Sequence, residues 1–274
     1  MTTTLRPAEP LQRGSAGALS RRFQVCVNGR PVGAVRLSTH PEYGPEVARV
    51  QDLRIEEPDR GRGRAAVAAL AAEEIARGWG CGRVEVSVPA DAVAALRLAT
   101  ALGYVQRNRN MAKRLAAEAP RLPAGSAARP MTEAEYGPWA AQVTQRLAES
   151  LVARGVPEAE ARRKSAQAHA RLLPDGPASE NTLISVLEHE AVPVGSLWLA
   201  LLPDMAYVYD VGVYPDRRGH GHGRTLMLLA EAQATAGGRD RIALNVFANN
   251  TPAERLYASL GYETTEYHLY KSLL

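Results

Sequence analysis

The stretch Asp-Val-Gly-Val-Tyr-Pro-Asp-Arg-Arg-Gly-His-Gly-His-Gly, residues 210–223, joins a short apolar segment to a helical one through a glycine-rich loop. Val208–Val213 is typical of a short strand, and Leu226, Leu229 and Ala230 follow at helical spacing. Glycine at alternate positions lets an anion approach the backbone N–H groups at the start of a helix. The stretch therefore predicts a strand, an anion-binding loop and a helix.

Other glycine-rich loops fit this stretch less well. A dinucleotide fingerprint needs an acidic residue about twenty positions on, at the end of the next strand, but that strand ends at residues 245–247, Asn-Val-Phe. The Gly-Lys-Ser/Thr of a P-loop is absent. His220 and His222 are two imidazoles at positions i and i+2 that belong to no metal-ligand motif, so we expect no metal site and place both histidines in variable positions of the loop.

The chain contains this unit twice, at a constant offset of 158 residues. The segments that recur are Val50–Ile55 with Val208–Val213, Arg60–Ala65 with Arg218–Gly223, Leu102–Tyr104 with Leu260–Tyr262, and Lys113 with Lys271. Residues 116–126 are small, Pro-rich and unpatterned, as in a linker. The repeat predicts a first domain over 1–115, this linker, and a second domain over 127–274.

Each copy shows the same order of elements: a hairpin, a strand, the loop, a helix, a strand, a second helix and a last strand. We expect an α/β (α+β) fold with two tandem domains, each a mixed central sheet with flanking helices. In the second copy, residues 133–154 and 157–173 predict two further helices. The first copy has only the fifteen residues between Pro7 and Phe23 at that place.

Two motifs together resemble the GNAT (GCN5-related N-acetyltransferase) family. The family's Arg/Gln-x-x-Gly-x-Gly/Ala motif matches Arg218, Gly221 and Gly223. Its Asn-x-x-Ala, Leu-Tyr and Gly-Phe/Tyr elements match, in order, Asn250, Ala253, Leu256, Tyr257, Gly261 and Tyr262. The resemblance covers about residues 127–274 well and residues 5–115 less fully. It implies two acyl-CoA N-acyltransferase domains and acetyl-CoA as cofactor; length and tandem layout also resemble mycothiol synthases within that family.

The resemblance implies roles for individual residues. Asn250 would touch the cofactor or fix the loop beside it. Tyr257 would protonate, or hydrogen-bond to, the thiolate that leaves when an amine attacks the thioester. The backbone that would bond the pantetheine arm like an added strand is that of Val211, Gly212 and Val213. The amides that would hold the pyrophosphate are those of Arg218, Gly219, His220, Gly221, His222, Gly223 and Arg224.

The base that deprotonates the amine is less clearly marked. Asp210 lies just before the loop, where family members often carry an acidic residue. Asp52 occupies the same place in the first copy, which favours a structural role, and a water relay is also open. Trp198, Tyr207 and Tyr209 fit an acceptor pocket and strand packing equally well.

The two copies differ at the residues that would do chemistry. At the offset of 158, Tyr257 falls on Ala99 and Asn250 falls on Ala92. The first copy therefore keeps the loop and loses the phenol and the amide. We expect the first domain to be degenerate and the second to be catalytic.

Composition excludes several other classes of protein. Net charge is +4, but the arginines are spread and aromatics are few, which does not suit nucleic-acid binding. No apolar run reaches the length of a membrane span. Cys26 and Cys81 are expected as free thiols in a reducing cytoplasm. We expect a monomeric or homodimeric enzyme that acetylates a primary amine of a small molecule or peptide in a ternary complex. The alternative is a non-catalytic acyl-CoA sensor or scaffold.

Overall fold

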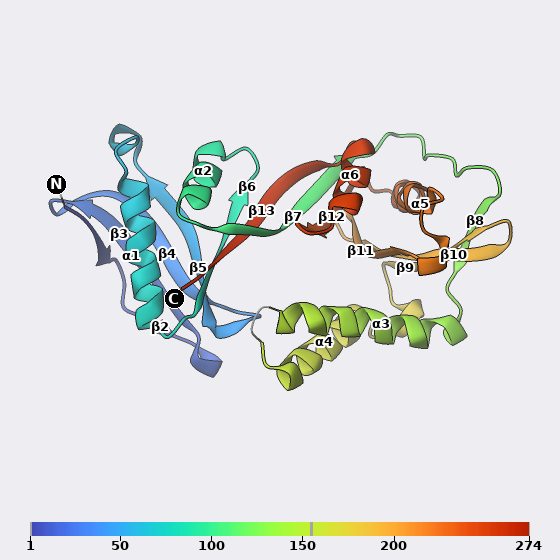
Figure 1. Ribbon diagram of the computed structural model, residues 1–274, viewed down its shortest axis with the longest axis horizontal. Coiled ribbons are helices and arrows are strands. Elements are labelled where there is room, and N and C mark those ends of the chain that lie inside the picture. The colour runs from blue at the N-terminus through green and yellow to red at the C-terminus, as the bar shows by residue number, and fades with distance from the viewer. Residues whose placement is uncertain (1, 154–155, 274) are drawn as a thin grey trace. The chain divides into compact units, whose positions relative to one another are not determined.

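The structure is a computed structural model that describes residues 2–153 and 156–273, and it divides into two compact units (Figure 1). Unit 1 consists of residues 1–109 and 265–274, and unit 2 of residues 110–264. These limits differ from the expected 1–115 and 127–274, since the last ten residues of the chain join the first unit. Both units combine a mixed sheet with helices, so the expected fold class is confirmed.

Unit 1 is built on a sheet with the strand order β1-β3-β4-β5-β6-β13, and β2 pairs with β3. Only β5 and β6 run parallel; the other recorded pairs are antiparallel. Helix α1 presents the small buried side chains of Ala68, Ala72 and Ala76, so it can approach the sheet closely. The elements are β1 (Thr3–Pro7), β2 (Gln12–Arg13), β3 (Leu19–Val27), β4 (Arg30–His40), β5 (Gly44–Ile55), α1 (Arg64–Gly78), β6 (Arg83–Pro89), α2 (Val93–Ala101) and β13 (Glu263–Ser272).

Unit 2 has the strand order β7-β12-β11-β10-β9-β8. Here β11 and β12 are the parallel pair, and β8, β9, β10 and β11 pair antiparallel in turn. The elements are β7 (Val105–Arg114), β8 (Ser126–Pro130), α3 (Glu133–Val152), α4 (Glu158–Leu172), β9 (Thr182–His189), β10 (Val192–Leu201), β11 (Ala206–Val213), α5 (His222–Ala236), β12 (Arg241–Phe247) and α6 (Thr251–Ser259).

Helices cover both faces of the unit 2 sheet, and β10 shows how. Leu197 and Leu199 are buried in one core cluster with Leu226 of α5, whereas Trp198 between them packs with Trp139 of α3 in another. Side chains alternate between the faces of a strand, so α3 and α5 lie on opposite faces, as Figure 1 also shows. Within the described residues, unit 1 has no counterpart of α3 and α4.

The two helices expected before β9 are confirmed as α3 and α4. Arg154, the expected last residue of the first, lies outside the described residues. Among the helices that the structure describes, none combines the length and the apolar character needed to cross a membrane.

The last strands of the two repeats are exchanged. Strand β13 closes the second repeat in sequence but pairs with β6 of unit 1, whereas the second half of β7, from the first repeat, belongs to unit 2. A lysine from each strand meets a buried glutamate. Lys271 Nζ lies 2.7 Å from Glu73 Oε2, and Lys113 Nζ lies 2.8 Å from both carboxylate oxygens of Glu231. The recurrence of lysine at the 158-residue offset thus marks the same ion pair in both units.

Candidate functional site

In unit 2, two parallel strands separate beside the glycine-rich loop. Strand β11 pairs with β12 only over Ala206–Val208, although it continues to Val213 and stays paired with β10 on its other edge. In the pairing recorded for the described residues, the edge of Val211–Val213 that faces β12 therefore has no strand partner. An extended ligand arm with amide groups could add to such an edge as a further strand.

The loop has the backbone expected of an anion site. Gly219 and Gly221 each have φ +82°, and Gly221 is the N-cap of α5. A side chain at such a left-handed position costs about 1–2 kcal/mol, which accounts for glycine at both. Among the described backbone hydrogen bonds, none is donated by an amide of residues 219–223. These amides, at the positive end of a helix, are thus available to a phosphate group.

Tyr257 and Asn250 both belong to α6, which follows the separated strand β12. Asn250 is the N-cap of this helix, and its Oδ1 accepts a hydrogen bond from the Ala253 amide at 3.3 Å. Tyr257 is buried at 7% exposure, with its ring 6.0 Å from that of Tyr262. Burial, and then the nearby charge of Asp210, raises the pKa of Tyr257 to about 12. The phenol is therefore protonated at neutral pH and can donate its proton.

Asp210 lies on β11 and forms an ion pair with Arg146 of α3 at 2.5 Å. Burial raises the pKa of Asp210, and the Arg146 guanidinium partly opposes this shift. The indole N–H of Trp139 also lowers this pKa, although the contact falls outside hydrogen-bond geometry. The carboxyl group is thus mostly buried beside a guanidinium, and its raised pKa makes it a better proton acceptor than an exposed aspartate.

The counterpart of Asp210 in unit 1 has a different environment. Asp52 is exposed and has φ +54°, whereas Asp210 is mostly buried and paired. The shared aspartate in the sequence therefore does not mean a shared structural role, and Asp52 does not count against Asp210 as a base.

The three aromatic residues form a row of ring contacts, stacked between Trp198 and Tyr209 and edge-on between Tyr209 and Tyr207. Trp198 is buried, and its ring lies 4.7 Å from that of Tyr209, which in turn lies 4.9 Å from that of Tyr207. Of the three, Tyr209 is exposed, so Trp198 serves packing and Tyr209 faces solvent. The rings of His220 and His222 lie 6.0 Å apart. Within the described residues no group of three His, Cys, Asp or Glu side chains could hold a metal ion.

Unit 1 repeats the loop over a large cavity. Gly61 and Gly63 have φ +73° and +71°, and Gly63 is the N-cap of α1. A cavity of about 740 Å³ extends from this loop between β5, β6 and α2, and Ala92 and Ala99 are among its lining residues. The cavity thus has no phenol or amide at the two places where unit 2 has Tyr257 and Asn250.

Comparison with known proteins agrees with this geometry. The model of the Acetyltransferase (GNAT) family matches residues 5–104 and 145–262, most of the chain. The chain belongs to the GNAT acetyltransferase family. The family model matches once in each repeat, so the chain is a tandem member of the family. Its enzyme class is acyltransferase.

Individual relatives support the same assignment. The "Uncharacterized N-acetyltransferase YdgE" of Bacillus subtilis is 32% identical over 149 residues, which are 52% of this chain and 95% of that protein. A "Mycothiol acetyltransferase" of Thermobispora bispora is 49% identical over 55 residues, only 20% of this chain and 19% of that protein. A tandem GNAT protein from the clavulanic acid biosynthesis pathway shares the fold, with TM-score 0.50 and 20% identity over 95% of this chain and 85% of its own.

Two features of the site could not be found in the sequence. Arg146 is one of many arginines, and only the packing of α3 brings it to Asp210. The exchange of β7 and β13 leaves no local trace, since both strands carry lysine at the same place in the repeat. In contrast, the loop, Asn250 and Tyr257 lie where the spacing of the motifs placed them.

Proposed function

We propose that unit 2 transfers the acetyl group of acetyl-CoA to a primary amine of a small molecule or peptide, by direct attack in a ternary complex. The observation that carries the proposal is the glycine-rich loop of unbonded amides beside the separated strands of unit 2. Burial, and then the charge of Asp210, raises the pKa of Tyr257, so this phenol on the helix that follows is protonated. Tyr257 and Asp210 both belong to this unit.

Each group has one step to perform. The loop amides of residues 219–223 hold the diphosphate, and the free edge of Val211–Val213 orients the arm that ends in the thioester. Asp210 accepts a proton from the ammonium group of the acceptor, directly or through water, so that the amine nitrogen can attack the carbonyl carbon. Tyr257 donates its proton to the sulfur as the C–S bond breaks, and the phenol is restored from solvent.

The proposal specifies the acceptor only as a primary amine. Mycothiol acetyltransferases match only short stretches of the chain, 55 residues in the example given, so their acceptor is one candidate. Amines of antibiotics, polyamines and amino acids are others, and α3 with Tyr209 would border the place where they enter.

The test is release of CoA thiol from acetyl-CoA in the presence of a panel of primary amines. We expect amine-dependent release, with Tyr257→Phe lowering kcat by about 10²-fold, the usual size of a general-acid contribution, and leaving the KM for acetyl-CoA unchanged. Tyr270→Phe, a matched control on β13 of unit 1, should retain full activity. If no amine increased thiol release, amine acetylation by unit 2 would be refuted, and a role of unit 2 as an acyl-CoA sensor or scaffold would be favoured.

A further inference from the structure

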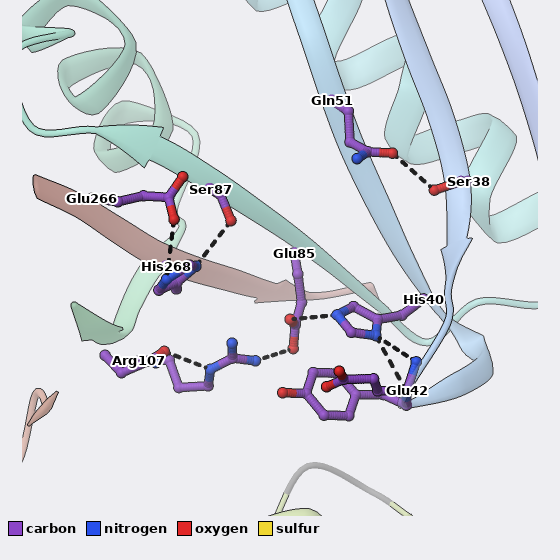
Figure 2. A network of polar contacts seen from close by, with 11 residues as sticks. Ser38, His40, Glu42, Gln51, Glu85, Ser87, Arg107, Glu266 and His268 are labelled. Atoms are coloured by element: carbon purple, nitrogen blue, oxygen red, sulfur yellow. Dashed lines mark hydrogen bonds and ion pairs between the residues drawn. The ribbon is translucent and has the colours of Figure 1, made fainter. Parts of the chain in front are cut away.

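Unit 1 carries a serine, a histidine and a glutamate in contact with one another in that order on two adjoining strands (Figure 2). Ser87 on β6 lies directly opposite His268 on β13. Ser87 Oγ is 2.9 Å from His268 Nδ1, and His268 Nε2 is 3.3 Å from Glu266 Oε2. A carboxylate at Nε2 favours the tautomer with its proton there. This leaves Nδ1 free to accept the proton of the Ser87 hydroxyl.

Ser87 lies where the strands of unit 1 separate. The parallel pairing of β5 with β6 ends at Val50 and Val86, and Ser87 is the next residue. It lines the cavity of about 740 Å³ that runs from the glycine-rich loop. It also lines a polar cavity of about 310 Å³, to which His268 contributes. Ser87 is therefore an exposed residue that borders both cavities, and its hydroxyl points to the side of β6 on which His268 lies.

The same place in unit 2 has different chemistry. At the offset of 158 residues, Ser87 corresponds to Asn245 and His268 to Asn110. These two amides are also bonded to each other, with Asn245 Nδ2 donating to Asn110 Oδ1 at 2.7 Å. The cross-strand pair is thus kept in both units, but at this place unit 1 has a hydroxyl beside an imidazole and unit 2 has two amides.

The surroundings of His268 favour a neutral imidazole. Burial is the largest cause that lowers its pKa, and Arg107 and Arg49 add to this effect, whereas Glu266 and Glu85 oppose it. Arg107 is itself paired with the buried Glu85 at 2.5 Å, so the charges next to the ring are largely balanced. A neutral imidazole is the form that can act as a general base.

We propose that unit 1 is a second active site, which hydrolyses short acyl-CoA thioesters through Ser87 as nucleophile, His268 as general base and Glu266 as the group that orients the imidazole. The arrangement has the logic of a serine hydrolase, in which the base is held by an acid and faces the hydroxyl. The proposal goes beyond amine acetylation in unit 2. It requires that the cavity of unit 1 accept the acyl-CoA.

The steps balance without a further reactant other than water. Ser87 Oγ attacks the thioester carbonyl carbon while His268 Nδ1 takes the hydroxyl proton. The C–S bond breaks, and His268 returns this proton to the departing thiolate, which leaves an ester on Ser87. His268 then takes a proton from a water molecule while the oxygen of that water attacks the ester carbonyl carbon. The C–O bond to Ser87 breaks, Ser87 regains a proton, and a carboxylic acid is released.

The test uses the full chain with Tyr257→Phe, so that unit 2 contributes little, and acetyl-CoA in buffer without amine. We expect steady release of CoA thiol and, after rapid acid quenching, a peptide containing Ser87 that is heavier by one acetyl group. Adding Ser87→Ala should remove the labelled peptide and lower thiol release by about 10²-fold or more, to the uncatalysed rate. His268→Gln should lower release by a similar factor.

Ser38→Ala is the matched control. Ser38 is another serine on the sheet of unit 1, bonded to Gln51 at 3.1 Å (Figure 2), and its loss should leave both readouts unchanged. Equal thermal midpoints for the two serine variants would confirm that neither disturbs the fold. Thiol release that persists in Ser87→Ala, or release no faster than in buffer alone, would overturn the proposal. Amine acetylation by unit 2 is measured separately, in the chain with Tyr257 intact. A failure of either proposal can therefore be recognised without the other.

Discussion

The exchange of the last strands can be tested through Lys271. In the repeat this residue belongs to the second copy, yet its Nζ pairs with Glu73 of unit 1, whose side chain is 1% exposed. Lys271→Met keeps the length of the side chain and removes the charge, so a buried carboxylate is left without its cation. Breaking a buried pair in this way costs about 3–5 kcal/mol. Lys271 is 23% exposed and water can reach the site, so we expect about 3 kcal/mol.

A loss of this size is a large share of the stability of one domain, about 5–15 kcal/mol, and it should be confined to one unit. Hydrogen exchange read by mass spectrometry on the intact chain can show this. We expect faster exchange in peptides from α1 and β6 and unchanged protection in α5 and β12. Adding Glu73→Gln removes the buried charge and should recover at least part of the loss.

Lys113→Met is the reciprocal control. Its partner Glu231 is 5% exposed and belongs to α5. This change should therefore speed hydrogen exchange in peptides of unit 2 and leave exchange in unit 1 unchanged. If Lys271→Met instead deprotected α5 and left α1 unchanged, each lysine would serve its own repeat, and the strand exchange would be refuted.

Three further predictions concern unit 2. Arg146 lowers the pKa of Asp210, so Arg146→Ala should raise that pKa and move the acid limb of the kcat/KM profile to higher pH. Because the pKa of Tyr257 is raised to about 12, the same profile should show no loss of rate from phenol ionisation below about pH 11. Gly221→Ala should raise the KM for acetyl-CoA, whereas Gly238→Ala, at a similar φ of +73°, should cost the same ~1 kcal/mol of strain and leave KM unchanged.

Much of unit 2 follows from local patterns in the sequence. The strand, loop and helix of residues 208–236 depend on glycine spacing and helical periodicity, both of which act over a few residues. The capping role of Asn250 is equally local. The environment of Asp210 is not, because burial and the Arg146 ion pair depend on where α3 packs. Local pattern therefore predicts the candidate residues, whereas tertiary packing determines the environment of Asp210.

The exchange itself could not have been predicted from local energetics. A last strand from either repeat brings a lysine to the same buried glutamate, so Glu73 would be paired whether Lys271 or Lys113 stood beside it. Exchange of identical elements is a change of low cost for this reason. Two near-equivalent arrangements of the same strands cannot be distinguished by counting the contacts that they share.

The difference between the arrangements lies in the contacts that the repeats do not share. Without exchange, Ser87 would face the counterpart of His268 in its own repeat, which is Asn110, and His268 would face Asn245. An amide, that of Asn110, would then face the serine in place of an imidazole. With exchange, the side-chain amides of Asn110 and Asn245 are hydrogen-bonded at 2.7 Å, and Ser87 Oγ lies 2.9 Å from His268 Nδ1. The exchange of strands is thus the feature that assembles the proposed second active site.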